Sequence, residues 1–157
     1  MASDPFLRED FRLLTPEAFD FVLNNELKRA VRSQNFLTLL LLEPMPTDPE
    51  RVPPSEVLRE VARLVSREVR ETDLLSQTTD GQISVVLLDS DLNNSMQVVD
   101  RLVSRFQHYE FHTPVVLEVG AATCPTHGAD AETLRRAAET RPVHPRRGNR
   151  GNASTAQ

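Results

Sequence analysis

The chain has 157 residues and a mass of 17.7 kDa, a length that suits one domain. It holds only five glycines and one lysine, Lys28, and neither a GxxxxGK[ST] nor a GxGxxG loop occurs, which argues against P-loop ATPases, kinases and Rossmann dehydrogenases. Residues 1–140 contain 14 basic and 23 acidic residues, a net charge of −9, and so acidic a body argues against nucleic-acid binding.

The first half of the chain predicts a helix, a strand, a loop and a second helix. Thr15 followed by Pro16 is typical of a helix start, with the threonine as the N-cap. Residues 36–42 are apolar almost throughout, which predicts a central strand covered on both faces. Residues 43–54 contain five prolines and are expected to form neither helix nor central strand. Ser55 is the expected N-cap of the second helix.

The second half predicts a hairpin, a helix, a strand and a short last helix. Asp80-Gly81 lies between two strand-like runs, 73–79 and 82–88, which is a hairpin signal. Residues 93–107 repeat apolar side chains at helical spacing, residues 114–123 form a fourth strand, and residues 131–141 form the last helix. The order helix, β-α-β-β-α-β, helix is the split pattern of ferredoxin-like and palm domains. It predicts an α+β sandwich with four strands in an antiparallel or mixed sheet and the helices on one face.

The remaining features set the expected boundaries and compartment. Residues 1–13 are expected to be an N-terminal extension, and residues 142–157 a disordered basic tail. Cys124 is the only cysteine, so no internal disulfide forms, and we expect a small apolar residue near a strand end rather than a nucleophile or redox sensor. No apolar run reaches membrane-spanning length and no signal peptide is visible, so a cytoplasmic protein without membrane insertion is expected. The four histidines lack metal-ligand spacing, and neither a metal nor another cofactor is expected.

From residue 14 to residue 140 the chain resembles a GGDEF domain, the catalytic domain of bacterial diguanylate cyclases. The resemblance rests on spacing and on several segments: the strand LTLLLLE, the segment VLREVARLVSREVRETDLLSQ, the strand ISVVLL, and VVLEVGAATCP with AETLRRAAE after it. It implies the palm-like fold with its ferredoxin-like core. It also implies a role in cyclic di-GMP signalling.

The signature of the family is degenerate in this chain. In the family, the signature lies at the hairpin tip after an RxxD; its glycines admit GTP phosphate and its acidic residue binds a metal ion. The positions that match the signature here are Thr79, Asp80, Gly81, Gln82 and Ile83. The resemblance therefore implies a lost metal ligand at Gly81 and a lost glycine at Thr79.

The rest of the catalytic machinery is also missing. Glu43 stands where the family has its first metal-binding Asp, but the following segment is shorter, Pro-rich and without the family's Lys, Asn and Gly. The late phosphate-binding lysine is absent, because Lys28 lies in the first helix. We expect no catalytic residues and no enzyme activity.

The family's allosteric product site is retained in the sequence. That site combines the RxxD with an arginine on the next helix, and the matching positions are Arg70, Asp73 and Arg101. An arginine fork suits O6 and N7 of guanine, and a carboxylate suits its N1–H and N2–H donors. The resemblance implies a cyclic di-GMP receptor that acts through these three residues, with a protein partner or a second copy of the chain reading out the signal.

One alternative to the receptor function stays open at the level of sequence. The dipole at the end of the helix favours a basic residue such as Arg70, and Asp73 can cap the turn that follows. Arg101 can belong to a solvated stripe of its helix. In that case the chain is a nucleotide-independent module for protein interaction or dimerisation, using its helix faces and the Pro-rich segment.

Overall fold

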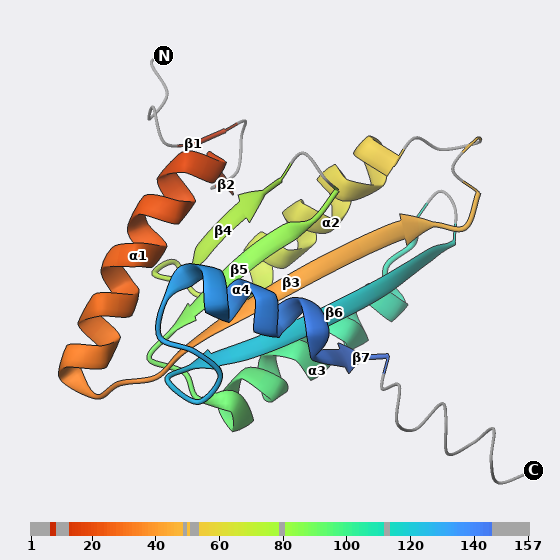
Figure 1. Cartoon of the computed structure of the whole chain (residues 1–157). Helices are drawn as coiled ribbons and strands as arrows, with labels where there is room; N and C mark the ends of the chain where they lie inside the picture. Colours follow the sequence, from red (N-terminus) through yellow and green to blue (C-terminus); the bar gives the residue numbers. More distant parts are fainter. Residues whose placement is uncertain are drawn as a thin grey trace, which may run out of the picture.

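The computed structural model describes residues 7–8, 13–48, 50, 54–78, 81–111 and 114–145. The strands are β1 Leu7–Arg8, β2 Leu13–Leu14, β3 Leu37–Pro46, β4 Leu74–Gln77, β5 Ile83–Leu88, β6 Val115–Cys124 and β7 Pro142–His144. The helices are α1 Pro16–Ser33, α2 Pro54–Glu68, α3 Leu92–His108 and α4 Ala131–Thr140 (Figure 1). Within these residues, none of the helices combines the length and apolar character that a membrane crossing needs.

The strands form one mixed sheet in the order β1-β2-β4-β5-β3-β6-β7. The four central strands, β4, β5, β3 and β6, pair antiparallel, and the β2–β4 pair is parallel. The predicted βαββαβ core of an α+β fold is therefore confirmed. The N-terminal segment adds β1 and β2 to the sheet, and Leu13, the first residue of β2, is buried in the core.

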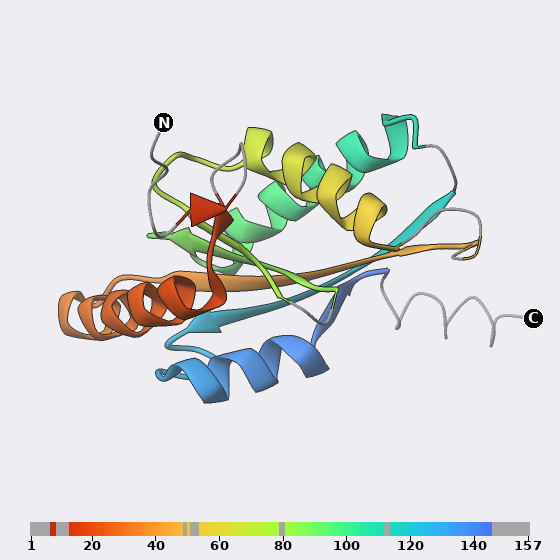
Figure 2. The ribbon, with the colours of Figure 1, turned by 90° about the horizontal axis from the view of Figure 1, so that it is seen from above.

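The helices cover both faces of the sheet, and the expectation of helices on one face is wrong. Figure 2 shows α2 and α3 on one side and α1 and α4 on the other. The alternation of β3 explains the two cores, because Leu40 packs with the α2–α3 side and Leu39 with the α1–α4 side. The terminal helices, which flank the βαββαβ core in sequence, supply the second layer.

The start of α1 follows the prediction and the start of α2 does not. Thr15 accepts the backbone N–H of Ala18 at 3.2 Å, as an N-cap does. In α2, Pro54 is already helical, so Ser55 lies inside the helix and is not its cap. The fixed φ of proline suits the first helical position, which explains the earlier start.

β3 continues four residues into the segment that was expected to be a loop. Its register with β5 ends at Leu42, while its register with β6 continues to Pro46. The N–H of Thr47 donates to the carbonyl of Pro114 beside β6. Because successive backbone N–H groups along a strand point to opposite sides, the nitrogens of Pro44 and Pro46 point away from β6. Proline is tolerated there because no hydrogen bond to β6 is lost.

The hairpin is confirmed, with β4 and β5 paired and the N–H of Thr78 bonded to the carbonyl of Gln82 at 2.8 Å. Gly81 has φ 82°, a left-handed conformation that glycine adopts without strain. Thr79 and Asp80, the first two positions of the degenerate signature, lie outside the described residues.

The expected disorder from residue 142 onward is wrong for its first three residues. Pro142–His144 form β7 against β6, and the N–H of Ala121 bonds to the carbonyl of Arg141 at 3.2 Å. This approach depends on Gly120, where an added Cβ would overlap the carbonyl oxygen of Ala138. Residues 146–157 of the predicted tail lie outside the described residues.

Candidate functional site

The structure brings Arg70 and Arg101 together at one pocket. The pocket has a volume of about 230 Å³ and lies between the end of α2, the β5–α3 turn and the outer side of α3. Arg70 follows α2, and Arg101 lies on α3, 31 positions later in the sequence. The remaining lining residues are Val69, Asp73, Leu87, Asp89, Ser90, Asn94 and Val98. All three residues predicted for a nucleotide site therefore line this pocket.

Asp73 is buried and ties the Arg70 turn to β5. Its Oδ2 accepts the backbone N–H of Arg70 at 3.0 Å, and its Oδ1 accepts the backbone N–H of Leu88 at 3.1 Å. The Arg70 guanidinium donates to both carboxylate oxygens and to the carbonyl of Leu88. The side chain of Asp73 is 2% exposed and that of Arg70 is 60% exposed. Asp73 thus both caps the turn and orients the arginine.

Arg101 reaches the same pocket from α3 and is held by the end of α2. It donates to the carbonyl of Glu68 at 2.9 Å and forms an ion pair with the Glu68 carboxylate at 3.3 Å. Arg105 forms a second ion pair with that carboxylate at 3.3 Å. A ligand anion at Arg101 would compete with Glu68, whose side chain is 17% exposed and stays close to both arginines.

Sequence reasoning missed the polar residues that the β5–α3 turn adds to the pocket. Asp89 has φ 53°, a left-handed conformation that is uncommon for a residue with a side chain. Ser90 is buried, its carbonyl accepts the Thr38 hydroxyl at 2.9 Å, and its hydroxyl bonds to Ser95 at 3.1 Å. The available signal was the sequence Asp-Ser-Asp between a buried strand and a helix, a composition typical of strand-to-helix turns.

Hydrogen bonds through Thr38 and Thr123 connect Ser90, which lines the pocket, to His127. Thr38 bonds to Thr123 at 2.8 Å, and the backbone N–H of Thr123 donates to Nδ1 of His127 at 2.9 Å. That bond requires a neutral imidazole acceptor. Burial, followed by the positive charge of Arg141, lowers the pKa of His127 from its ordinary value of 6.5.

Acidification is expected to destabilise the fold. Because the pKa of His127 is lower in the folded state, the unfolded chain binds the extra proton first. The stabilisation is present above pH 6.5 and is lost as the pH falls through the folded pKa. We expect the free energy of unfolding in urea to decrease between pH 7.5 and 5.5, and to decrease less in His127→Asn. Burial also lowers the pKa of His144, so a smaller dependence of the unfolding free energy on pH should remain in that variant. An unchanged slope in His127→Asn would contradict this prediction.

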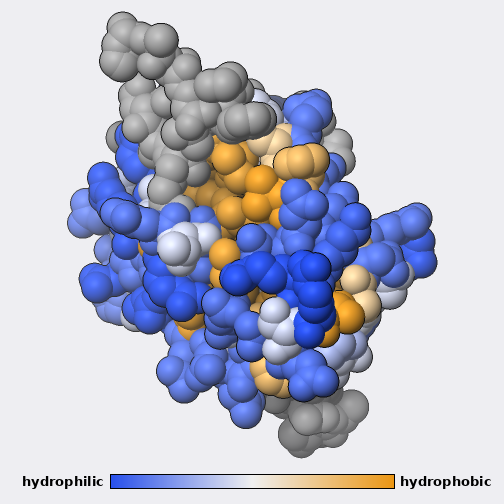
Figure 3. Space-filling model, turned by 90° about the vertical axis from the view of Figure 1, so that its left-hand side faces the viewer, coloured by the Kyte–Doolittle hydropathy of each residue, from blue (hydrophilic) through white to orange (hydrophobic). Residues whose placement is uncertain are grey.

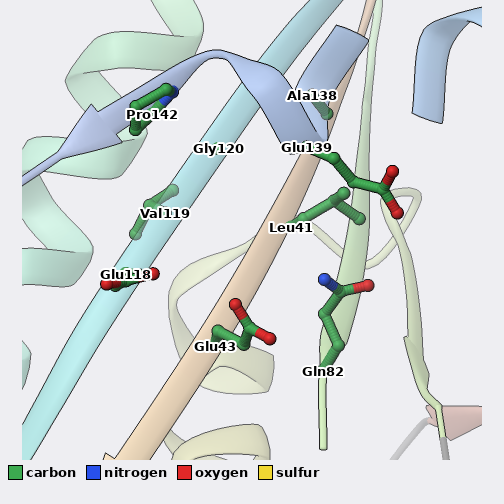
Figure 4. A pocket seen from close by; sticks show the side chains of 9 residues that line it. All are labelled: Leu41, Glu43, Gln82, Glu118, Val119, Gly120, Ala138, Glu139 and Pro142. Carbon is green, nitrogen blue, oxygen red and sulfur yellow. The ribbon is translucent and has the colours of Figure 1, made fainter. Parts of the chain in front are cut away.

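A second pocket, of about 280 Å³, lies where the degenerate signature meets β3 (Figure 4). Glu43, at the expected position of the family's metal-binding Asp, lines it together with Gln82 of the hairpin and with Glu118, the register partner of Glu43 on β6. Gly81, the neighbour of Gln82 in the hairpin, has no side chain that could bind a metal ion. Ile83 is buried in the core. Among the described residues, no group of three or more acidic, histidine or cysteine side chains is placed to hold a metal ion.

Solved structures share this fold at low sequence identity. The FimX GGDEF domain from Pseudomonas aeruginosa matches with a TM-score of 0.76 and 15% identity, covering 87% of this chain and 91% of that one. The GGDEF domain of YfiN (TpbB) from the same organism matches with a TM-score of 0.74, 18% identity and coverage of 82% and 86%. The GGDEF domain of DgcB from Caulobacter crescentus, solved in complex with c-di-GMP, has a TM-score of 0.73, 12% identity and 89% coverage of both chains.

The sequence itself identifies the family. No curated protein matches the chain significantly. The family model described as "Diguanylate cyclase, GGDEF domain" matches residues 55–150, which is more than half of the chain and includes α2 from its second residue, the hairpin, α3 and β6. The chain therefore belongs to the GGDEF family.

Proposed function

We propose that this GGDEF domain is a catalytically inactive receptor for cyclic di-GMP and binds one guanine of the ligand in the Arg70–Arg101 pocket. The observation that carries the proposal is the convergence of these two arginines, which lie far apart in sequence, on one pocket. Two guanidinium groups facing a small pocket suit a ligand that combines a purine with phosphates.

The dimensions of the pocket fit part of the ligand. At about 230 Å³ it is smaller than the roughly 300–1,000 Å³ that is typical of sites for drug-sized molecules. One base can enter while the rest of the cyclic dinucleotide stays outside. The second guanine is then available to another copy of the chain or to a partner, which gives the receptor a route to a readout.

The pocket beside the degenerate signature supports the proposed absence of catalysis. Phosphoryl transfer by two divalent ions needs oxygen ligands fixed on both sides of the metal pair. Here the described hairpin residues Gly81 and Gln82 carry no carboxylate. The acidic residues that line the pocket, Glu43, Glu118 and Glu139, form no group placed to hold a metal ion among the described residues. With GTP and Mg²⁺ we expect no cyclic di-GMP by chromatography. Product formation that disappears in Glu43→Gln would contradict this part of the proposal.

Calorimetric titration with cyclic di-GMP tests the receptor role. We expect Arg70→Ala to weaken binding by at least about tenfold, because a bidentate arginine–guanine pair is worth about 1–3 kcal/mol. Arg67→Ala is the matched control, because it removes an exposed arginine on α2 that does not line the pocket. Absence of binding at high micromolar ligand, or equal affinity in Arg70→Ala, would rule out the proposed site.

The exposed side of α1 favours protein docking as a second function. Phe21 is 68% exposed, and Val31 is about half exposed. Figure 3, which faces this side of the molecule, shows a mostly hydrophilic surface interrupted by apolar patches. If α1 mediates self-association, light scattering will show a dimer whose population falls in Phe21→Ser, with and without cyclic di-GMP. A monomer at all concentrations would exclude dimerisation through α1.

The single buried cysteine, Cys124, supports a cytoplasmic location for either function.

A further inference from the structure

The two longest strands, β3 and β6, extend beyond the neighbouring elements of the sheet. The register of β3 with β5 ends at Leu42, whereas its register with β6 continues to Pro46. Figure 2 shows this two-stranded extension reaching past the end of α4. On it Met45 and Val116 are register partners, and they are 54% and 49% exposed. The extension therefore presents an uncovered face with an apolar pair.

The same face carries three carboxylates. Glu43 and Glu118 are register partners two positions from Met45 and Val116, so they point to the same side of the strands. Glu139 of α4 lines the pocket beside them (Figure 4). Like charges directly opposite each other on paired strands are destabilising. Within the described part of the chain, none of these glutamates forms an ion pair, so their repulsion is uncompensated there.

The outer edge of β3 beside this face offers hydrogen-bond acceptors and no donors. The nitrogens of Pro44 and Pro46 point away from β6 and carry no hydrogen, and the carbonyls of these residues point the same way. A strand added at this edge would bring carbonyls of its own against them, whereas an arginine side chain brings only donors. The edge and the carboxylates therefore select a cationic occupant.

The chain after β7 leads toward this face. β7 pairs antiparallel with β6, with Pro142 opposite Gly120 and His144 opposite Val119, so the chain advances along β6 toward Glu118. Pro142 itself lines the pocket with the three glutamates.

Residues 146–157, which lie outside the described residues, have the complementary charge. They contain three arginines, Arg146, Arg147 and Arg150, and no acidic residue. A chain spans at most about 3.6 Å per residue, so the Cα of Arg147 lies within about 11 Å of the Cα of His144. The first two arginines are therefore within side-chain reach of the part of β6 that precedes Val119.

We propose that residues 146–157 dock on the exposed β3–β6 face and cover the pocket beside the degenerate signature. Their three arginines match the three carboxylates in number. An arginine lays its aliphatic stem along apolar surface while its guanidinium binds a carboxylate, so Met45 and Val116 pack under the stems. The contact is independent of the proposed cyclic di-GMP pocket, which lies on the α2–α3 side.

Paramagnetic relaxation in the full-length chain tests the contact. A nitroxide on Asn152→Cys should broaden the amide signals of Met45, Val116 and Glu118, and Cys124 is buried and should stay unlabelled. The double variant Glu43→Gln/Glu118→Gln should reduce the broadening, as should about 0.5 M salt, which screens exposed charges. This variant removes a like-charge pair, so the fold should be kept. The control, Glu17→Gln/Glu26→Gln, removes two carboxylates from α1 and should leave the broadening unchanged.

Tryptic cleavage after Arg147 and Arg150 gives a second measure. The rate should rise about 2- to 30-fold in Glu43→Gln/Glu118→Gln, the range for losing two exposed ion pairs, and should stay at the wild-type value in the α1 control. Equal broadening and equal cleavage rates in the wild type and in Glu43→Gln/Glu118→Gln would overturn the proposal. Protection that is lost on dilution would place the segment on a second copy of the chain and would overturn the contact within one chain.

Discussion

Gly120→Ala is expected to destabilise the protein by about 3 kcal/mol or more, at the upper end of the usual cost of overpacking. At this chain length that corresponds to a decrease of roughly 6–12 °C in the melting temperature. The new methyl group would overlap the carbonyl oxygen of Ala138, in the last turn of α4. That carbonyl accepts the N–H of Arg141, and the carbonyl of Arg141 in turn accepts the N–H of Ala121. Moving the end of α4 therefore disturbs both its C-cap and the start of β7.

Gly81→Ala is the control for glycine replacement as such. At Gly81 an added Cβ meets no atom within 4 Å, and the cost comes from φ 82° alone. A left-handed residue with a side chain costs about 1–2 kcal/mol. Thermal unfolding followed by circular dichroism should rank Gly120→Ala well below Gly81→Ala. Equal melting temperatures would mean that α4 does not press against β6 at Gly120.

The central sheet could be predicted because its signals are local. The apolar run 36–42 needs cover on both faces wherever it lies, and Asp80-Gly81 requires a turn whatever surrounds it. The continuation of β3 through Pro44 and Pro46 was missed because the sequence does not show which side of a strand lacks a neighbour. Only the pairing tells that the nitrogens of these prolines face away from β6.

The second helical layer and β7 depend on contacts between distant parts of the chain. α1 and α4 pack together on one face although more than 95 residues separate the end of one from the start of the other. β7 forms because Gly120 lets the chain after α4 approach β6, and nothing near Pro142 in sequence indicates that partner. Composition around residues 142–157 predicts disorder, and for β7 this long-range pairing overrides it.

The members of the candidate site could be predicted from the sequence, and the hydrogen bonds that hold them in place could not. Fixed spacing identified Arg70, Asp73 and Arg101, and all three line one pocket. Spacing does not show that the backbone N–H of Leu88 donates a hydrogen bond to the carboxylate of Asp73. It also does not show that Asp89, sixteen positions later, faces the same space.

Asp73→Ala is expected to lower the free energy of unfolding by about 3 kcal/mol, because two partly buried backbone donors lose their acceptor, at about 1–3 kcal/mol each. The backbone N–H groups of Arg70 and Leu88 would both lose their acceptor. Asp91→Ala is the matched control. It removes a carboxylate that caps α3 through one N–H, at a cost of about 1 kcal/mol. Urea unfolding measures both values. A loss in Asp73→Ala no larger than that in Asp91→Ala would show that the two bonds are replaced by water.

The conservative variant Asp73→Asn links this stability to binding. The amide keeps one acceptor oxygen and the shape of the side chain, so one of the two backbone N–H bonds is kept, while the other N–H loses its acceptor and the ion pair with Arg70 is lost. Cyclic di-GMP affinity should fall, because the guanidinium is no longer held toward the guanine. Calorimetric titration with cyclic di-GMP measures this loss, and wild-type affinity in Asp73→Asn would show that the ion pair with Asp73 does not contribute to binding.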